Sequence, residues 1–305
     1  MKSTVLPATI LGLFFIFYFP LLGQEMEDPS GTEFSVFWEE LTSADFKKAV
    51  EKSSGVCLVP VGVIEKHGPH LPLGTDLIGC REVAMMGAKR EYAIVFPPYY
   101  ATQIFEAKHQ PGTIAYSADI QLKLLQETCD EIARNGIKKI IIVNGHGGNQ
   151  ALLPYFIQSQ LASERDYAVY LFSPSYTDEE NEVIQKLSKA PVDGHAGENE
   201  TSRRMIHRPD LIHLERAETE NYDDKDRIAN LMDAYVGIWW YASYPNHYAG
   251  PAKYANTELG SVALDIKVDH LVDMIKTVKA DTNVLRLQEQ FYNESALPLK
   301  TIQDQ

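Results

Sequence analysis

The chain has 305 residues, of which 45% are hydrophobic and 23% are charged, a composition typical of a globular protein with a sizeable core. Its formal net charge is −14, and no cluster of lysines and arginines is long enough to follow a phosphate backbone, so we expect no nucleic-acid partner. No repeat, low-complexity tract or Pro/Ser-rich linker interrupts residues 25–305, which indicates a single domain over that range.

The N-terminal residues 1–24 have the pattern of a secretory signal peptide. A short basic start precedes residues 5–22, which are dense in Leu, Ile and Phe, and a polar run follows. The apolar stretch is close to the lower limit for crossing a bilayer, and Pro20 interrupts it, so cleavage near Gly23 is favoured over an uncleaved anchor. We therefore expect a periplasmic or secreted protein without stable membrane association after cleavage.

Beyond this segment, apolar runs alternate with amphipathic segments of helical period. The predicted strands are residues 56–64, 93–96, 138–143 and 167–172. The predicted helices are residues 77–90, 118–135, 150–164, 178–187, 198–207, 226–242 and 268–290. Strands that alternate with helices indicate βαβ units, and therefore an α/β fold with a mostly parallel sheet.

Three cysteines, Cys57, Cys80 and Cys129, lack the spacing of a metal finger. Free cysteine is among the most buried residue types, so we expect all three in the core. A bridge between Cys57 and Cys80 is an open alternative in an oxidising compartment.

The first chemically informative segment directly follows the strand predicted over residues 56–64. It places three good metal ligands, Glu65, His67 and Asp76, within twelve residues at the carboxyl end of that strand. Open α/β sheets place their active sites at this edge. Two carboxylates and an imidazole suit Zn²⁺, Mn²⁺ or Fe²⁺ better than a structural zinc site, which favours cysteine. A polar loop with helix-capping residues is the alternative for this segment alone.

Two further segments each place a histidine beside small residues, where the backbone can approach an ion or a substrate closely. Residues 144–149 read Asn-Gly-His-Gly-Gly-Asn and follow the third predicted strand. Residues 195–202 read His-Ala-Gly-Glu-Asn-Glu-Thr-Ser and lead into a predicted helix. Three such segments in one chain indicate a functional site and not packing.

Together, the motifs E-x-H-G-x-H-L-P-x-x-x-D, N-G-H-G-G-N and H-A-G-E-x-E-T-S resemble those of the creatininase (creatinine amidohydrolase) family. The resemblance runs over about residues 37–285. It implies a three-layer α/β/α sandwich, a site for two divalent metal ions, and hydrolysis of a C–N amide bond by a metal-bound hydroxide. It also implies a homo-oligomer, with a hexamer as the family analogy, and a small-molecule amide as substrate. Zinc is the first choice of metal, with manganese or iron as alternatives.

The resemblance also assigns roles to individual residues. Asp76 matches the bridging carboxylate, Glu65 and His146 match the other ligands of one ion, and His67 matches a ligand of the second. Glu198 is our preferred final ligand, and His195 matches a catalytic histidine that does not bind metal. Glu200 is the competing ligand and is otherwise placed with His195 among the catalytic residues.

The sequence also departs from the family pattern. In creatininase itself a glutamate stands two residues after the N-G-H histidine, where this chain has Gly148, and the Phe expected before Pro-Gly-Thr is Gln110. We therefore rank a non-creatinine amide first, as a small cyclic amide, a formamide or a short peptide. Creatinine itself, a binuclear metallophosphoesterase and a non-catalytic metal- or ligand-binding relative are the alternatives.

Overall fold

The structure is a computed structural model that describes Met1, residues 34–231 and residues 233–301. The chain divides into two units, Met1–Gly31 and Thr32–Gln305, and the account below concerns the second. The expected signal peptide therefore lies outside the described residues. Within those residues, no helix combines the length and the apolar character that crossing a membrane requires.

Four parallel strands form the sheet in the order β2-β1-β3-β4. They are β1 (Val56–Val61), β2 (Ile94–Val95), β3 (Lys139–Asn144) and β4 (Ala168–Phe172). Every residue of the two central strands is buried, because helices cover both faces of a parallel sheet. The four predicted strands are thus confirmed, although β1 ends three residues before the predicted boundary.

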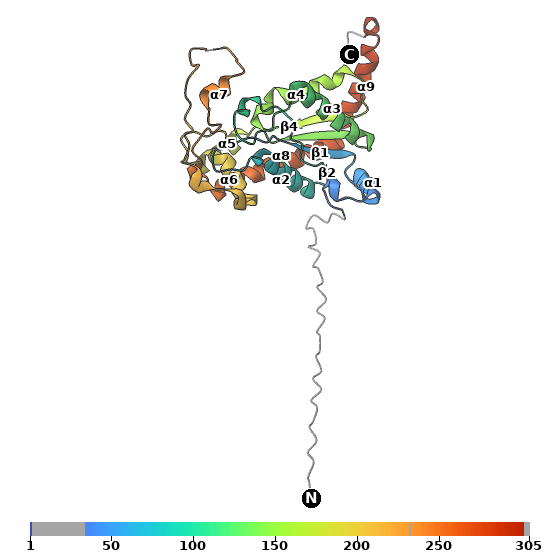
Figure 1. Cartoon of the computed structure of the whole chain (residues 1–305). Coiled ribbons are helices and arrows are strands. Elements are labelled where there is room, and N and C mark those ends of the chain that lie inside the picture. The colour runs from blue at the N-terminus through green and yellow to red at the C-terminus, as the bar shows by residue number, and fades with distance from the viewer. Residues whose placement is uncertain (2–33, 232, 302–305) are drawn as a thin grey trace. The chain divides into compact units, whose positions relative to one another are not determined.

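Helices cover the two faces of this sheet, with α2 and α8 on one side and α3 and α4 on the other (Figure 1). The helices are α1 (Ser43–Lys52), α2 (Thr75–Arg90), α3 (Ala118–Arg134), α4 (Leu152–Ser159), α5 (Asp178–Leu187), α6 (Glu198–His207), α7 (Trp239–Ser243), α8 (Thr257–Ala280) and α9 (Asn283–Ser295). This arrangement is the three-layer α/β/α sandwich that the sequence predicts.

Two predicted helices are wrong in extent. Only the end of the segment 226–242 is helical, as α7, because Asp226 and Asp233 adopt positive φ angles of 50° and 64° that interrupt a helix. The predicted helix 268–290 is two helices, because the side chain of Asp281 accepts hydrogen bonds from the backbone of the first residues of α9.

A buried lysine joins the sheet to the helix that covers it. Lys139 begins β3, and its Nζ donates to the carbonyl oxygens of Val278, Lys279 and Asp281 at 2.7, 3.0 and 2.7 Å. These carbonyls belong to the C-terminal end of α8, where a helix leaves its last acceptors unsatisfied and favours a positive charge. These three hydrogen bonds offset the cost of burying the ammonium, and they stabilise the C-terminal end of α8.

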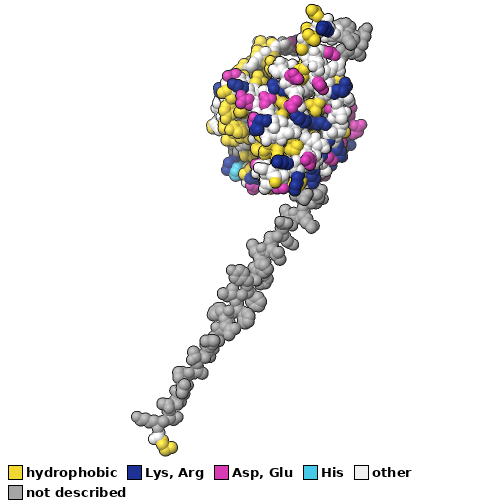
Figure 2. All heavy atoms as spheres, turned by 90° about the vertical axis from the view of Figure 1, so that its right-hand side faces the viewer, with side chains coloured by type: hydrophobic (Ala, Val, Ile, Leu, Met, Phe, Trp, Pro, Cys, Tyr) yellow, Lys and Arg dark blue, Asp and Glu magenta, His cyan; other side chains and the backbone are white. Residues whose placement is uncertain are grey.

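The three cysteines are buried and free, so their predicted place in the core is confirmed and Cys57 and Cys80 are not bridged. Burial raises the pKa of Cys80 to about 12, which keeps that thiol protonated and unreactive at neutral pH. On the surface, the face drawn in Figure 2 intersperses acidic and basic side chains with apolar ones.

The sheet topology brings two of the sequence motifs together. Val61 at the end of β1 pairs in register with Asn144 at the end of β3, so the loops that follow both strands start side by side. Gly145 then passes so close to α2 that a Cβ atom there would lie 2.7 Å from the carbonyl oxygen of Asp76. The absent side chain lets the start of α2 approach the end of β3.

Candidate metal centre

Asp76 is the central carboxylate of the site. It lies in the first turn of α2, and its two oxygens face two different histidines. Asp76 Oδ1 is 3.1 Å from His67 Nε2, and Asp76 Oδ2 is 3.0 Å from His146 Nδ1. One carboxylate is therefore shared by two groups of ligand atoms, which is the arrangement that a bridging ligand of two ions requires.

The first group consists of Glu65, Asp76 and His146, all of them buried. Glu65 Oε1 and Asp76 Oδ2 lie 2.9 and 3.0 Å from His146 Nδ1, and neither oxygen has a further hydrogen-bond partner among the described residues. Ligand atoms about 2.1 Å from one ion lie about 3 Å apart when they subtend a right angle at it. The spacing and the orphaned oxygens therefore fit a divalent cation.

The second group consists of His67, Asp76 and Glu200. His67 Nδ1 donates to the backbone carbonyl of Glu65 at 3.2 Å, which turns Nε2 towards Asp76 and Glu200. Glu200 Oε1 lies 3.6 Å from that Nε2, and Glu200 Oε2 accepts from the backbone N–H of Ala196 at 2.8 Å. A backbone contact thus orients each of the two side chains, as is usual around metal ligands.

Glu198 does not fit the ligand role that we expected for it. Its buried carboxylate accepts hydrogen bonds at 2.8–3.0 Å from the backbone N–H groups of Lys189 and Ala190. These bonds hold the connection between α5 and α6 against the N-terminus of α6. Successive helical positions point in different directions, so of the two glutamates only Glu200 reaches the ligand cluster.

The same carboxylates control the electrostatics of the centre. Burial lowers the pKa of His67, but the negative charges of Glu200, Asp76 and Glu65 outweigh it and raise that pKa to about 10. His146 is affected in the same way, and its pKa lies well above the usual value. Without metal, protonated imidazoles therefore balance the carboxylates, as cations would.

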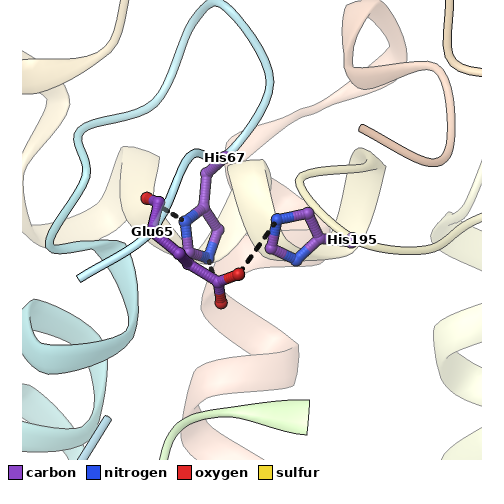
Figure 3. A group of neighbouring side chains, drawn as sticks. All are labelled: Glu65, His67 and His195. Atoms are coloured by element: carbon purple, nitrogen blue, oxygen red, sulfur yellow. Dashed lines mark hydrogen bonds and ion pairs between the residues drawn. The ribbon is translucent and has the colours of Figure 1, made fainter. Parts of the chain in front are cut away.

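His195 stands beside the ligands with a defined tautomer. Its Nε2 donates to the backbone carbonyl of Lys66 at 2.8 Å and lies 4.0 Å from Glu65 Oε2 (Figure 3). Burial and the charge of His67 lower the pKa of His195 to about 4. The imidazole is therefore neutral at pH 7, and its Nδ1 carries the lone pair that can accept a proton.

A further histidine, His247, lies in the site although no motif of the sequence marks it. Its Nε2 forms a short hydrogen bond with Glu65 Oε2, and its Nδ1 accepts from the indole N–H of Trp240 at 2.8 Å. Because an indole can only donate, His247 must carry its own proton on Nε2 and donate it to Glu65. The second oxygen of Glu65 is thereby occupied, and the first is turned to His146.

Several flanking residues have structural roles. His70 is buried and forms a hydrogen bond with Thr201 Oγ1 at 2.9 Å, which holds the loop after β1 against α6. The side chain of Asn144 accepts from the backbone N–H of His146 at 3.1 Å and orders that loop. His109 bonds to the carbonyl of Pro245 at 2.8 Å and thus stabilises a turn.

The ligand cluster opens into a cavity of about 540 Å³. Trp239, Trp240 and Tyr176 supply its aromatic walls, and Glu106 and Arg203 supply charged groups outside the ligand cluster. A cavity of this size, with a few converging polar groups, suits a small molecule or a short peptide end.

Fold and site together define a hydrolase with an α/β fold and a buried acidic cluster of candidate metal ligands. The family model described as creatininase (creatinine amidohydrolase) matches residues 39–275, so the chain belongs to the creatininase family. Creatinine amidohydrolase of Pseudomonas putida is 29% identical over 256 residues, which cover 79% of this chain and 96% of that protein. The mycofactocin precursor peptide peptidase of Mycolicibacterium smegmatis is 33% identical over 161 residues, covering 51% and 59% of the two chains.

Among solved structures, a mutant creatininase of the Zn–Zn type superposes with a TM-score of 0.65 at 25% identity. The match covers 81% of this chain and all of that one. The family and the fold inferred from the three motifs are therefore confirmed.

Proposed function

We propose that this protein is an exported, metal-dependent amidohydrolase that holds two divalent ions, with zinc as the first choice. The observation that carries the proposal is the position of Asp76, whose two oxygens face His67 and His146 from opposite ends of one carboxylate. Membership of the creatininase family and the zinc pair of the related mutant enzyme support it.

Glu65, Asp76 and His146 would hold one ion, and His67, Asp76 and Glu200 would hold the other. When bound, such ions lower the pKa of a water molecule towards neutrality and polarise a carbonyl group. Glu200 replaces Glu198 in this assignment. In creatininase itself a glutamate stands at the position of Gly148, in the loop after β3. In this chain Glu200 would supply the corresponding carboxylate from α6.

His195 would move the proton. Its neutral imidazole accepts a proton at Nδ1 while Nε2 remains bonded to Lys66. The imidazolium formed in this way can pass the proton to the departing nitrogen, since a broken C–N bond needs a proton on the amine that leaves. The nearby carboxylate of Glu65 favours that charged form during the reaction.

The substrate would be an amide other than creatinine. Gly148 and Gln110 depart from the family pattern at two positions. One relative of this chain acts on creatinine and another on a peptide, so the family scaffold accepts amides of different shapes. Small cyclic amides, formamides and short peptides form the panel of substrates to be tested. Creatinine is added to test for creatininase activity, and p-nitrophenyl phosphate to test for phosphoesterase activity.

Export and assembly are parts of the same proposal. The basic start and the apolar residues 5–22 support cleavage of a signal peptide and a periplasmic or secreted location. Mass spectrometry of the native protein would then find an N-terminus near residue 24, and an intact Met1 would contradict it. A closed homo-oligomer, with the hexamer as first choice, is tested by mass measurement in solution.

The deciding experiment is elemental analysis of mature protein purified without added metal or chelator. We expect close to two divalent ions per chain, and hydrolysis of at least one amide of the panel. The variant Asp76→Ala should retain almost no metal and almost no activity. If Asp76→Ala kept two ions, the shared-carboxylate assignment would be wrong, and metal-replete protein without any hydrolysis would favour a binding role.

A further inference from the structure

The cavity contains one cation without a partner. Arg203 lies on α6 and lines both the cavity and the small space behind the metal centre. Among the residues that the structure describes, its guanidinium forms no ion pair and no side-chain hydrogen bond, and its Nε atom is buried without a partner. An arginine in this state has its donors available for a ligand.

Helical geometry places Arg203 close to the reacting centre. It follows Glu200 by three residues, so the two side chains share a face of α6 and are separated by about 4.5 Å along the helix axis. Arg203 and Glu200 also line the same cavity and the same small space behind the proposed ligands. A ligand in this cavity can therefore contact the guanidinium and the proposed ligand cluster together.

The neighbouring cations differ from Arg203 because their positions are explained by packing. Arg204 approaches the carbonyl of Thr75 at 3.4 Å and His207 Nε2 at 3.2 Å, and its guanidinium lies against Gly79, where even a Cβ atom would clash. Lys267 reaches the same region from α8, and burial, with the charges of both arginines, lowers its pKa to about 8. Three cations thus repel one another at the back of the site, which favours an anion in front of them.

Two acidic side chains outside the ligand cluster also line the cavity, namely Glu106 and Asp193, and Asp193 already accepts hydrogen bonds from the backbone N–H groups of Gly194 and Asn199. Glu106 Oε1 is close to Gly148 and His146, on the loop side of the centre, where a Cβ atom added to Gly148 would lie 3.1 Å from it. Arg203 instead belongs to α6 and adjoins Glu200. Among the described residues that line the cavity, Arg203 is the one lysine or arginine, so an acidic group of a ligand is favoured beside it.

We propose that Arg203 binds a carboxylate of the substrate, so that the amide hydrolysed by this enzyme carries an acidic group near its scissile bond. This inference rests on the proposed amidohydrolase function and narrows its substrate class. Arginine holds a carboxylate through paired N–H donors, a geometry that lysine does not reproduce. Because Arg203 lines the same cavity as the ligand cluster and stands three residues after Glu200 on α6, the proposal selects N-acyl amino acids, including the C-terminal residue of a dipeptide, where one carbon separates the amide nitrogen from the carboxylate.

The test compares two probes that differ only in this group, N-acetylglycine and the uncharged N-acetylglycinamide. Zinc-loaded full-length mature protein is titrated with each by calorimetry. We expect the carboxylate probe to bind at least about tenfold more tightly, the effect of one good charge-assisted contact. Arg203→Gln should abolish most of this preference, and Arg203→Lys should retain part of it. Arg208→Gln is the matched control, because Arg208 is an exposed residue at the C-terminal end of α6 and already pairs with Asp210.

Each remaining outcome overturns the inference. These outcomes are equal binding of the two probes, no measurable binding of N-acetylglycine, and a preference that survives in Arg203→Gln. The last result would mean that metal coordination alone selects the carboxylate. Failure of the proposed function would look different, because the wild-type protein would then bind N-acetylglycine selectively but hydrolyse no amide of the panel.

Discussion

Trp240 donates its indole N–H to Nδ1 of His247 across 2.8 Å, and this single bond determines which nitrogen of the imidazole carries the proton. His247 must then donate from Nε2 to Glu65, and Glu65 is left with one oxygen for a metal ion. A tryptophan in the cavity wall is therefore connected to the orientation of a proposed ligand. Such outer contacts typically change metal affinity by 10- to 100-fold.

The first prediction concerns that connection. Trp240→Phe keeps an aromatic wall but removes the donor, so His247 can adopt the other tautomer and release Glu65. We expect metal affinity, measured by competition with a chelator, to fall by about tenfold or more. Trp239→Phe is the control, because Trp239 also lines the cavity but has no hydrogen bond to a site residue. Equal effects of the two substitutions would reject the role of the indole N–H.

The second prediction separates the two glutamates at the start of α6. Glu200→Gln should lose at least one ion in elemental analysis, because it removes a charged ligand. Glu198→Gln should keep the metal content but lower the free energy of unfolding by about 1–3 kcal/mol, because it weakens buried charge-assisted bonds to Lys189 and Ala190. Loss of metal in Glu198→Gln with full content in Glu200→Gln would restore our original assignment.

The third prediction uses two adjacent glycines. A Cβ atom at Gly148 would lie 2.4 Å from His146 Nε2, whereas one at Gly147 would meet nothing within 4 Å. Gly148→Ala should therefore displace the imidazole and weaken metal binding by about tenfold or more, the usual cost of disturbing a ligand's surroundings. Gly147→Ala should leave affinity and thermal stability unchanged. Similar metal affinities for both variants would show that His146 does not need its present position.

The fourth prediction concerns pH. In the metal-free protein the pKa of His67 is about 10 and that of His146 is well above its usual value, so both imidazoles hold a proton at pH 7. Metal ligands must be deprotonated, so binding should release about two protons, and affinity should rise as pH increases from 7 towards 10. Calorimetry in two buffers of different ionisation enthalpy measures this release. Binding heats that are independent of the buffer would contradict it.

Protonation should also affect the stability of the metal-free protein, with a sign that follows from the raised pKa of His67. The protonated, carboxylate-paired imidazole contributes its stabilisation fully below about pH 6.5, the unfolded-state value. The contribution is lost as pH rises towards the folded-state pKa of about 10. Thermal melting of chelator-treated protein between these two pH values should therefore show a falling Tm.

Much of the fold and most members of the candidate ligand cluster could be predicted from the sequence, because local signals indicate both. Buried β-branched runs identified all four strands, and the motifs at their ends identified Glu65, His67, Asp76 and His146, which the structure brings together. For the last ligand we preferred Glu198 from the sequence, whereas the structure places Glu200 in the cluster. Both stand in one helical turn, and the path of residues 188–197 decides which of them faces the cluster.

His247 and Arg203 could not be predicted for a related reason. His247 comes 182 residues after Glu65 and stands in an aromatic stretch that has no motif of its own. Arg203 follows the third motif directly, yet its unpaired state depends on what packs around α6. Contacts between distant segments leave no periodicity or spacing in one sequence.

The position of His247 also has a consequence for the order in which the protein matures. The proposed ligands lie between residues 65 and 200, but the imidazole that orients Glu65 is reached only after a further stretch of chain. We expect that contact of high sequence separation to form late, because closing a long loop is entropically costly. A chain that has emerged only as far as α6 would hold a full set of ligand atoms but a poorly oriented Glu65. We therefore expect high metal affinity to develop only after the C-terminal part has folded, so that an incompletely folded chain binds metal weakly.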